Sequence, residues 1–234
     1  MLLGSGLRTT KLGLGAMGMS AFYFDASSTP AEHEAESLRT LEEAVRLSAP
    51  HAAFIDTAFI YGHPSGATNE ELIGKAVASL GRDKFFIATK MGIEFDASGI
   101  KLDSSPSGIR RQLGISLSRL GVKHIDLYYQ HRVDPATPIE TVAATMKQLI
   151  EEGAIRGYGL SECTPDELRR AHSVHPVAAV QLEYSLSTRG AEKTVIPVCR
   201  ELGVGVVAYS PLGRGLLSQS FTKRSDLGEG DWCV

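Results

Sequence analysis

Short runs of apolar residues recur along the chain and alternate with longer amphipathic stretches. The runs are rich in Val, Ile, Phe and Tyr, and most of them lack the strict alternation of apolar and polar positions that marks a half-exposed strand. This pattern is typical of strands that are buried on both faces of a parallel sheet. It predicts seven strands, at residues 12–15, 53–56, 85–90, 125–131, 155–161, 177–183 and 204–210.

The stretches between these runs predict amphipathic helices with recognisable ends. A threonine at the N-cap accepts a hydrogen bond from the backbone N–H three residues later, and a glutamate at that later position bonds back to the cap. A proline also suits the first helical position. Capping boxes of this kind are predicted at Thr29, Thr68, Thr137 and Thr164, and Ser105-Pro106 begins a further helix. Glycines suited to a helix C-terminus follow at Gly121, Gly153 and Gly203.

Strands that alternate with helices imply parallel pairing through right-handed crossovers. An open doubly wound sheet and a (β/α)8 barrel both fit this alternation. The predicted strands begin on average about every 32 residues, so an eighth strand would begin near residue 236, beyond the last of the 234 residues. We therefore expect a single domain over residues 1–234 that contains seven βα units.

The composition narrows the class of protein. The 24 basic and 27 acidic residues give a formal charge of −3, which argues against a nucleic-acid partner. No apolar run approaches the roughly 20 residues that cross a bilayer, so we expect no membrane partner. The three cysteines, Cys163, Cys199 and Cys233, show no metal-ligand spacing, so a metal site or a disulfide scaffold is not expected. A reducing, cytoplasmic location is the expectation that follows.

Residues 13–18 match the GxGxxG pattern of a dinucleotide-binding Rossmann loop. That interpretation requires a helix to open at the glycines, so that its N-terminus faces the pyrophosphate. Here an aromatic loop follows, and the first helix cap comes only at Thr29. We therefore favour the alternative that the glycines end a strand tightly and let the backbone approach a ligand.

Polar side chains stand at the carboxyl ends of the predicted strands, where parallel α/β folds bind their ligands. Asp56, Lys90 and His131 each end one strand, and Tyr61 follows soon after Asp56. Taken singly, each has an ordinary structural explanation in packing, solvation or backbone bonding. A buried Asp and Lys nevertheless need each other, because an isolated charge in a low dielectric is costly.

A tyrosine beside this pair has a chemical use. An unperturbed phenol has a pKa of roughly 10, and a nearby ammonium favours the phenolate and lowers that pKa. Asp56 would hold Lys90 in place, and His131 would orient a substrate oxygen. The predicted constellation suits a general acid, Tyr61, aimed at the alkoxide that develops when a carbonyl is reduced. Because none of these groups supplies a hydride, a nicotinamide cofactor is implied.

At this point the chain resembles the aldo-keto reductase family, from the N-terminus to about residue 232. The most specific segments are FIDTAFIYG at 54–62, IATK at 87–90, IDLYYQH at 125–131 and AYSPLGRGLL at 208–217. The segments GLGAMGMS, YGLSE and VQLEYSL, at 13–20, 158–162 and 180–186, resemble the branch related to potassium-channel β-subunits and aryl-alcohol dehydrogenases.

The resemblance implies a (β/α)8 TIM barrel that uses NADP(H) to reduce aldehydes or ketones to alcohols. It assigns catalysis to Asp56, Tyr61, Lys90 and His131. By the same resemblance, Ser161 and Gln181 would bond the nicotinamide carboxamide, and Tyr209 would stack on the nicotinamide ring. The residues that would line the pyrophosphate path are Ser210, Leu212, Gly213 and Arg214. The implied cofactor-binding residues are Gly15, Ala16, Met17, Asp56, Ser161, Gln181, Tyr209, Ser210, Pro211, Leu212, Gly213 and Arg214.

Three further expectations follow from the comparison with the family pattern. Phe22, Tyr23 and Phe24 would wall the substrate pocket, or else cap the barrel. Glu162 stands where many members carry Asn, and a carboxylate cannot donate to the carboxamide carbonyl. The family also continues past residue 232 with roughly one more βα unit and a basic loop for the 2′-phosphate, so a truncated barrel is expected.

Two hypotheses therefore remain open from the sequence. The first is an NADP-dependent aldo-keto reductase that acts on a small carbonyl substrate. The second is a non-catalytic fragment, or a regulatory or binding protein with impaired cofactor binding, because seven strands leave unpaired edges in an eight-strand barrel. A Rossmann-type dehydrogenase is disfavoured. The sequence leaves open the physiological substrate, the direction of the reaction and the oligomeric state.

Overall fold

The structure is a computed structural model that describes residues 1–20, 29–62, 68–96, 99–218 and 223. Seven parallel strands form one sheet, and neighbours in the sheet follow the order of the chain. The strands are β1 Gly13–Gly15, β2 Ala53–Asp56, β3 Phe85–Met91, β6 Leu127–Gln130, β7 Tyr158–Ser161, β8 Ala179–Glu183 and β9 Gly205–Tyr209. Seven strands, joined in the described residues by six helices, follow the order of a (β/α)8 barrel, so the predicted fold class of an incomplete barrel is confirmed.

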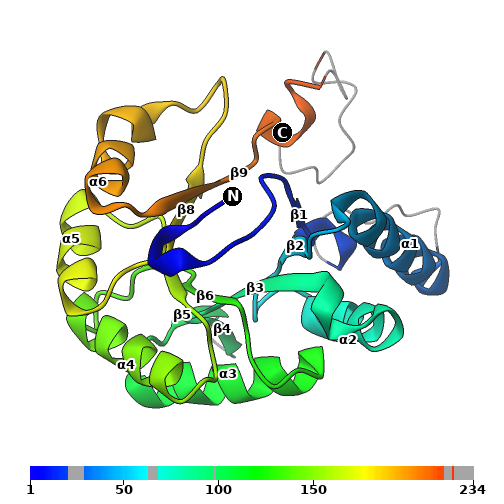
Figure 1. The fold of residues 1–234 in the computed structure, drawn as a ribbon, viewed down its shortest axis with the longest axis horizontal. Coiled ribbons are helices and arrows are strands. Elements are labelled where there is room, and N and C mark those ends of the chain that lie inside the picture. Colours follow the sequence, from blue (N-terminus) through cyan, green and yellow to red (C-terminus); the bar gives the residue numbers. More distant parts are fainter. Residues whose placement is uncertain (21–28, 63–67, 97–98, 219–222, 224–234) are drawn as a thin grey trace.

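The α-helices lie outside the strands (Figure 1), and the described residues contain six of them. They are α1 Pro30–Ser48, α2 Asn69–Leu80, α3 Pro106–Leu120, α4 Ile139–Glu151, α5 Pro165–Val174 and α6 Val195–Leu202. The predicted capping boxes form at Thr29, Thr68 and Thr164, where each threonine accepts from the N–H of the glutamate that bonds back to it. Gly121 and Gly203 end α3 and α6 in the left-handed conformation, as predicted.

The predicted capping box at Thr137 is wrong. The N-cap of α4 is Pro138, and no side chain caps this helix. The Thr137 hydroxyl instead donates to Asp134 Oδ2 at 3.1 Å, and Asp134 Oδ1 accepts from the Ala136 N–H at 2.9 Å. The carboxylate of Asp134 therefore closes its own turn and takes the hydroxyl that the helix would have used.

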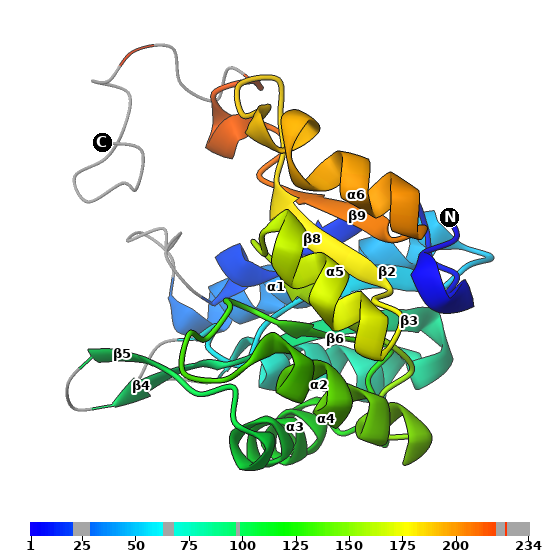
Figure 2. The ribbon, with the colours of Figure 1, turned by 90° about the vertical axis from the view of Figure 1, so that its left-hand side faces the viewer.

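A β-hairpin that the strand count did not include follows β3. It consists of β4 Ile93–Asp96 and β5 Gly99–Leu102, paired antiparallel with Ile93 opposite Leu102. Apolar and charged residues alternate on its strands, so the segment lacks the continuous apolar character by which the buried strands were recognised. Figure 2 shows the hairpin projecting on the side of the molecule opposite the N-terminus.

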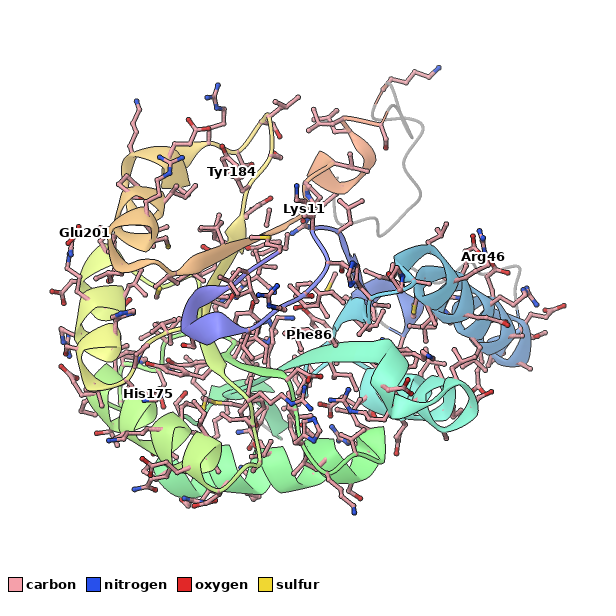
Figure 3. The ribbon with its side chains drawn as sticks, viewed as in Figure 1. Lys11, Arg46, Phe86, His175, Tyr184 and Glu201 are labelled. Atoms are coloured by element: carbon pink, nitrogen blue, oxygen red, sulfur yellow. The ribbon has the colours of Figure 1, made fainter. Side chains whose placement is uncertain are left out.

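The apolar core has two parts, one on each face of the sheet. The larger part lies between the sheet and the helices, and the smaller part fills the ring of strands. Figure 3 shows Phe86 inside that ring, whereas Arg46 and Glu201 lie on the outer helices. The inner part contains Leu3, Phe54, Phe86, Ala88, Leu127, Tyr129, Ala178 and Ala179.

The N-terminal turn closes one end of the inner core. Leu3 is buried there, and the Gly4 N–H donates to the Ala178 carbonyl at 2.8 Å. A Cβ on Gly4 would come within 2.8 Å of the Val177 carbonyl oxygen, so only glycine allows this approach. Apolar side chains therefore occupy the amino ends of the strands, and the polar residues collect at the carboxyl ends.

The GxGxxG segment does not open a long helix. Its first three residues form β1, and a short 3-10 turn, η2 Met17–Met19, follows. Helix α1 begins only at Pro30. The interpretation as a Rossmann loop is therefore excluded, as the sequence indicated.

None of the helices in the described part of the chain is both long enough and apolar enough to cross a bilayer.

Candidate active site

Three neighbouring strands place the four predicted catalytic residues at one end of the barrel. Asp56 is the last residue of β2, Lys90 lies near the end of β3, and His131 directly follows β6. Tyr61 lies in the segment that leaves β2. Because side chains alternate along a strand and Phe86 and Ala88 face the inner core, Lys90 faces the barrel interior as well.

Lys90 is the centre of the site. Its side chain is 1% exposed, and Nζ donates to Asp56 Oδ1 at 2.5 Å and to the Thr57 carbonyl at 2.8 Å. Nζ also lies 3.5 Å from the Tyr61 hydroxyl. Burial opposes the charge of Lys90, but Asp56 and Tyr61 outweigh it, and the pKa of the ammonium is raised. Lys90 is therefore a fixed positive charge beside the phenol.

Asp56 is held on both of its carboxylate oxygens. Oδ1 accepts from Lys90, and Oδ2 accepts from Gln181 Nε2 at 2.7 Å. The Ala16 N–H donates to the Asp56 carbonyl at 2.8 Å, which joins the β1 loop to the same point. One N–H of the Gln181 amide is engaged with Asp56, which fixes the amide and leaves its carbonyl as an acceptor for a ligand.

His131, which directly follows β6, packs against the ring of Tyr61. The two rings are 5.8 Å apart between centroids and nearly perpendicular, at 82°. His131 is 8% exposed, and burial, then Lys90 and Arg132, lower its pKa to about 2. Its imidazole is therefore neutral at physiological pH, where it serves as a hydrogen-bond donor rather than as a charged acid.

Arg132 belongs to the site although sequence reasoning missed it. Its guanidinium donates to the His131 carbonyl at 2.7 Å and to Ser161 Oγ at 3.2 Å. It therefore joins the end of β6 to the end of β7. The sequence held one indication of this role, because Arg132 directly follows His131 at the end of a predicted strand.

Gly13 and Gly15 have different reasons to be glycine. A Cβ on Gly13 would lie 2.9 Å from the Phe54 ring, so packing inside the barrel requires glycine there. A Cβ on Gly15 would meet no atom of the described residues within 4 Å, so among these residues the backbone at the end of β1 borders open space. Gly15 also lies opposite Asp56 in the sheet register, and Ala16 and Met17 follow at the start of η2.

Asn69 is a second residue that the sequence did not single out. It is fully buried at the start of α2, and its Nδ2 donates to the Ala16 carbonyl at 2.8 Å and to Ser20 Oγ at 2.7 Å. Its Oδ1 accepts from Thr57 Oγ1 at 2.5 Å. Asn69 therefore holds the loop after β1 against the loop after β2.

The predicted pyrophosphate segment forms a turn at the carboxyl end of β9. Ser210 and Arg214 have φ values of 49° and 55°, and the Gly213 N–H donates to the Ser210 carbonyl at 2.9 Å. Pro211 and Leu212 lie within this turn, and Leu212 is 57% exposed. The segment therefore presents a tight, exposed bend next to the strand that carries Gln181.

Glu162 directly follows β7 and Tyr209 ends β9, so the two residues lie on either side of β8. Glu162 Oε1 accepts from the Glu183 N–H at 2.8 Å, so this carboxylate ties β7 to β8. Burial, then Glu162, raises the pKa of Tyr209 to about 12, so this phenol keeps its proton. The residues 22–24 expected to wall the substrate pocket lie outside the described residues.

The chain matches the profile of the aldo/keto reductase family over residues 11–233. It is 45% identical over 211 residues to a "Probable aldo-keto reductase 1" of Glycine max, a match that covers 90% of this chain and 58% of that protein. The chain belongs to the aldo/keto reductase family. It spans less than two thirds of the length of this curated relative.

Solved structures agree with this membership. A glycerol dehydrogenase from Gluconobacter oxydans superimposes with a TM-score of 0.83 and 28% identity, covering 99% of this chain and 69% of that one. An aldo-keto reductase from Klebsiella pneumoniae, solved in complex with NADPH, gives a TM-score of 0.74 and 25% identity, covering 93% and 69%.

Proposed function

We propose that the chain is an NADPH-dependent carbonyl reductase that converts a small aldehyde or ketone to an alcohol, with Tyr61 as the general acid. The observation that carries this proposal is the buried Lys90 ammonium, bonded to Asp56 and within 3.5 Å of the Tyr61 hydroxyl. A phenol held beside a fixed positive charge can release its proton to an adjacent oxygen, because the ammonium stabilises the phenolate that remains.

Each residue has a defined part in the proposed reaction. The neutral His131 imidazole donates a hydrogen bond that orients the substrate carbonyl oxygen beside Tyr61. A nicotinamide cofactor bound beside these residues would supply the hydride that reduces the carbonyl carbon. Tyr61 gives its hydroxyl proton to the carbonyl oxygen, and the Lys90 ammonium, held in place by Asp56, balances the negative charge left on the phenolate.

The residues around the four fit a nicotinamide cofactor. Gly15 leaves open space beside Asp56, and a nicotinamide carboxamide has both a donor and an acceptor that the Ser161 hydroxyl and the Gln181 carbonyl can bond. Tyr209 offers an aromatic face, and the bend at residues 210–214 offers backbone N–H groups and the Arg214 cation for phosphate. The Klebsiella pneumoniae relative was solved with NADPH, which supports the same choice of cofactor.

Two expectations about the setting are part of the proposal. We assign residues 1–234 to a single domain. We also assign the chain to the reducing cytoplasm, because Cys163 and Cys199 are buried free thiols. We also expect no nucleic-acid partner, because the formal charge is −3, and no membrane partner, because the apolar runs of the sequence are far shorter than the roughly 20 residues that cross a bilayer.

The test follows the loss of NADPH absorbance in the presence of an aromatic aldehyde. The expected result is turnover by the wild-type chain. Tyr61→Phe should lower kcat by about 10²–10⁴-fold, the usual contribution of a general acid, with the NADPH dissociation constant unchanged.

Two outcomes contradict the proposal in different ways. A folded wild-type chain that does not bind NADPH, measured by fluorescence titration, would favour the non-catalytic alternative. Turnover that survives Tyr61→Phe would show that another group is the acid.

A further inference from the structure

A buried ion pair lies on the outer face of the sheet, behind the candidate site. Glu70 is in the first turn of α2 and is fully buried, and Arg119 is in the last turn of α3 with a side chain that is 24% exposed. Arg119 Nη1 lies 3.2 Å from Glu70 Oε2. The two helices approach closely here, since a Cβ on Gly74 would come within 2.5 Å of the Arg119 carbonyl oxygen.

The pair reaches the segment that carries Tyr61. Arg119 Nη1 donates to the Phe59 carbonyl at 3.1 Å, and its guanidinium carbon lies 4.6 Å from the centre of the Phe59 ring. The Phe59 N–H in turn donates to the Lys90 carbonyl at 2.9 Å. Arg119 therefore fixes the chain two residues before Tyr61.

The same pair also reaches the strand that carries Lys90. Glu70 Oε1 accepts from Thr89 Oγ1 at 2.7 Å, and Thr89 is the neighbour of Lys90 in β3. Thr89 faces the helices and Lys90 faces the barrel interior, because side chains alternate along the strand. Glu70 is thus bonded to β3 through one oxygen and, through Arg119, to the Tyr61 segment with the other.

We propose that Glu70 and Arg119 are positioning residues that set the separation between the Tyr61 hydroxyl and Lys90 Nζ. This inference rests on the proposed carbonyl reduction. A buried ion pair is weak support for a fold when apolar residues can replace it, so stability alone does not account for these charges. The Lys90–Tyr61 separation is already 3.5 Å, so a small shift of either segment breaks the contact.

The first test is Glu70→Gln, which keeps the size of the side chain and an acceptor for Thr89 but weakens the bond to Arg119. A misplacement of about 1 Å at a reacting group lowers rates by about 10²-fold. We expect kcat with an aromatic aldehyde to fall by about 10–100-fold, while KM for NADPH stays within about twofold, because neither residue touches the proposed cofactor site.

Arg119 provides a graded second series. Arg119→Lys keeps the charge but loses the planar fork and the stacking on Phe59. Arg119→Met loses the charge as well. We expect kcat to fall in the order wild type, Arg119→Lys, Arg119→Met, so that the conservative variant recovers part of the rate. If Glu70→Gln does not fold, the kcat of Arg119→Lys tests the positioning role instead, because the Arg119 side chain is partly exposed whereas that of Glu70 is fully buried.

A matched control lies on the same helix. Arg110, also on α3, makes two bonds to Glu152, at 2.8 and 2.7 Å, on the surface of the molecule. Glu152→Gln removes an ion pair of the same chemical type that does not approach Tyr61. It should leave both kcat and KM unchanged.

The outcomes separate this inference from the proposed function. A wild-type kcat in both Glu70→Gln and Arg119→Lys overturns the positioning role and leaves the proposed reductase activity intact. Lower melting temperatures with unchanged kcat in the folded fraction overturn it as well, because they indicate a structural role. A folded, inactive wild-type chain overturns the proposed function, and this inference with it.

Discussion

The functional residues on β3, in the middle of the sheet, differ in burial from those at the β9 edge. Strand β3 pairs with β2 and β6, is buried along its whole length and holds Lys90 by three hydrogen-bond partners. Strand β9 pairs, within the described residues, with β8, and its residues are half-buried or exposed. The lysine proposed to stabilise the phenolate thus lies on a fully buried strand, and the proposed phosphate turn follows a strand that is only partly buried.

The difference follows from the charges that each region carries. A buried ammonium must have complete partners, because an unpaired charge in a low dielectric destabilises the fold by several kcal/mol. The turn after β9 carries its cation, Arg214, at an exposed position, where solvent screens the charge. Changes at the middle of the sheet should therefore affect stability and catalysis together, and changes at β9 should affect ligand affinity.

The largest expected effect is that of Lys90→Met. The substitution leaves the Asp56 carboxylate without its cation, and breaking a buried pair in this way lowers the free energy of unfolding by about 3–5 kcal/mol. Reductase activity should also be lost. Urea unfolding and the aldehyde assay measure the two effects, and the exposed Lys193→Met is the control. A stability equal to that of the control would show that the ion pair is not a structural requirement.

A second prediction concerns pH. The pKa of His131 is lowered from 6.5 to about 2 in the fold. Between these values the unfolded chain binds a proton that the folded chain does not, so stability is full above pH 6.5 and falls as the pH decreases. At 1.36 kcal/mol per unit, the free energy of unfolding should fall by about 2 kcal/mol between pH 7 and 5 from this group.

His131→Gln isolates this contribution, because the amide does not titrate. The variant should lose about 2 kcal/mol less than the wild type over the same pH interval. Urea titrations at several pH values measure the slope. Identical slopes for the two proteins would contradict the assigned burial of His131.

The β9 edge should give a smaller effect that is confined to binding. Tyr209→Ala removes an aromatic face, which typically contributes about 0.5–1.5 kcal/mol, so the NADPH dissociation constant should rise by up to about tenfold. Tyr209→Phe keeps the ring and should bind as the wild type does. If Tyr209→Ala lowered the free energy of unfolding as much as Lys90→Met, the contrast between middle and edge would be wrong.

The smallest effect is expected at a surface ion pair near the same edge. Arg169 on α5 and Glu201 on α6 make two bonds of 2.6 Å, but both side chains are about half exposed. Water and salt screen such pairs, so Glu201→Gln should change the melting temperature by about 1 °C or less. Calorimetry at low and high salt measures this. A larger fall in the melting temperature would mean that the difference in burial does not explain why the Asp56–Lys90 pair is expected to contribute more to stability than this pair.

Local sequence predicted the elements well where neighbouring residues define them. The boxes at Thr29, Thr68 and Thr164 form because their donors and acceptors lie within four residues. The box at Thr137 does not form, although the segment has the same Thr-Pro-x-Glu pattern as those at Thr29 and Thr164. The Thr137 side chain instead bonds to Asp134. The hairpin of β4 and β5 was missed because its apolar and charged residues alternate, whereas the buried strands were recognised by continuous apolar runs.

The sequence by itself determined the seven-strand plan and the end of each strand at which Asp56, Lys90 and His131 stand. Strand period and burial fix these positions, since both are properties of short runs of residues. Only the tertiary structure decided which groups hold the site in place. Glu70, Asn69, Arg119 and Arg132 act through contacts between segments that are far apart in the chain, and no spacing in the sequence encodes which helix end will lie against which loop.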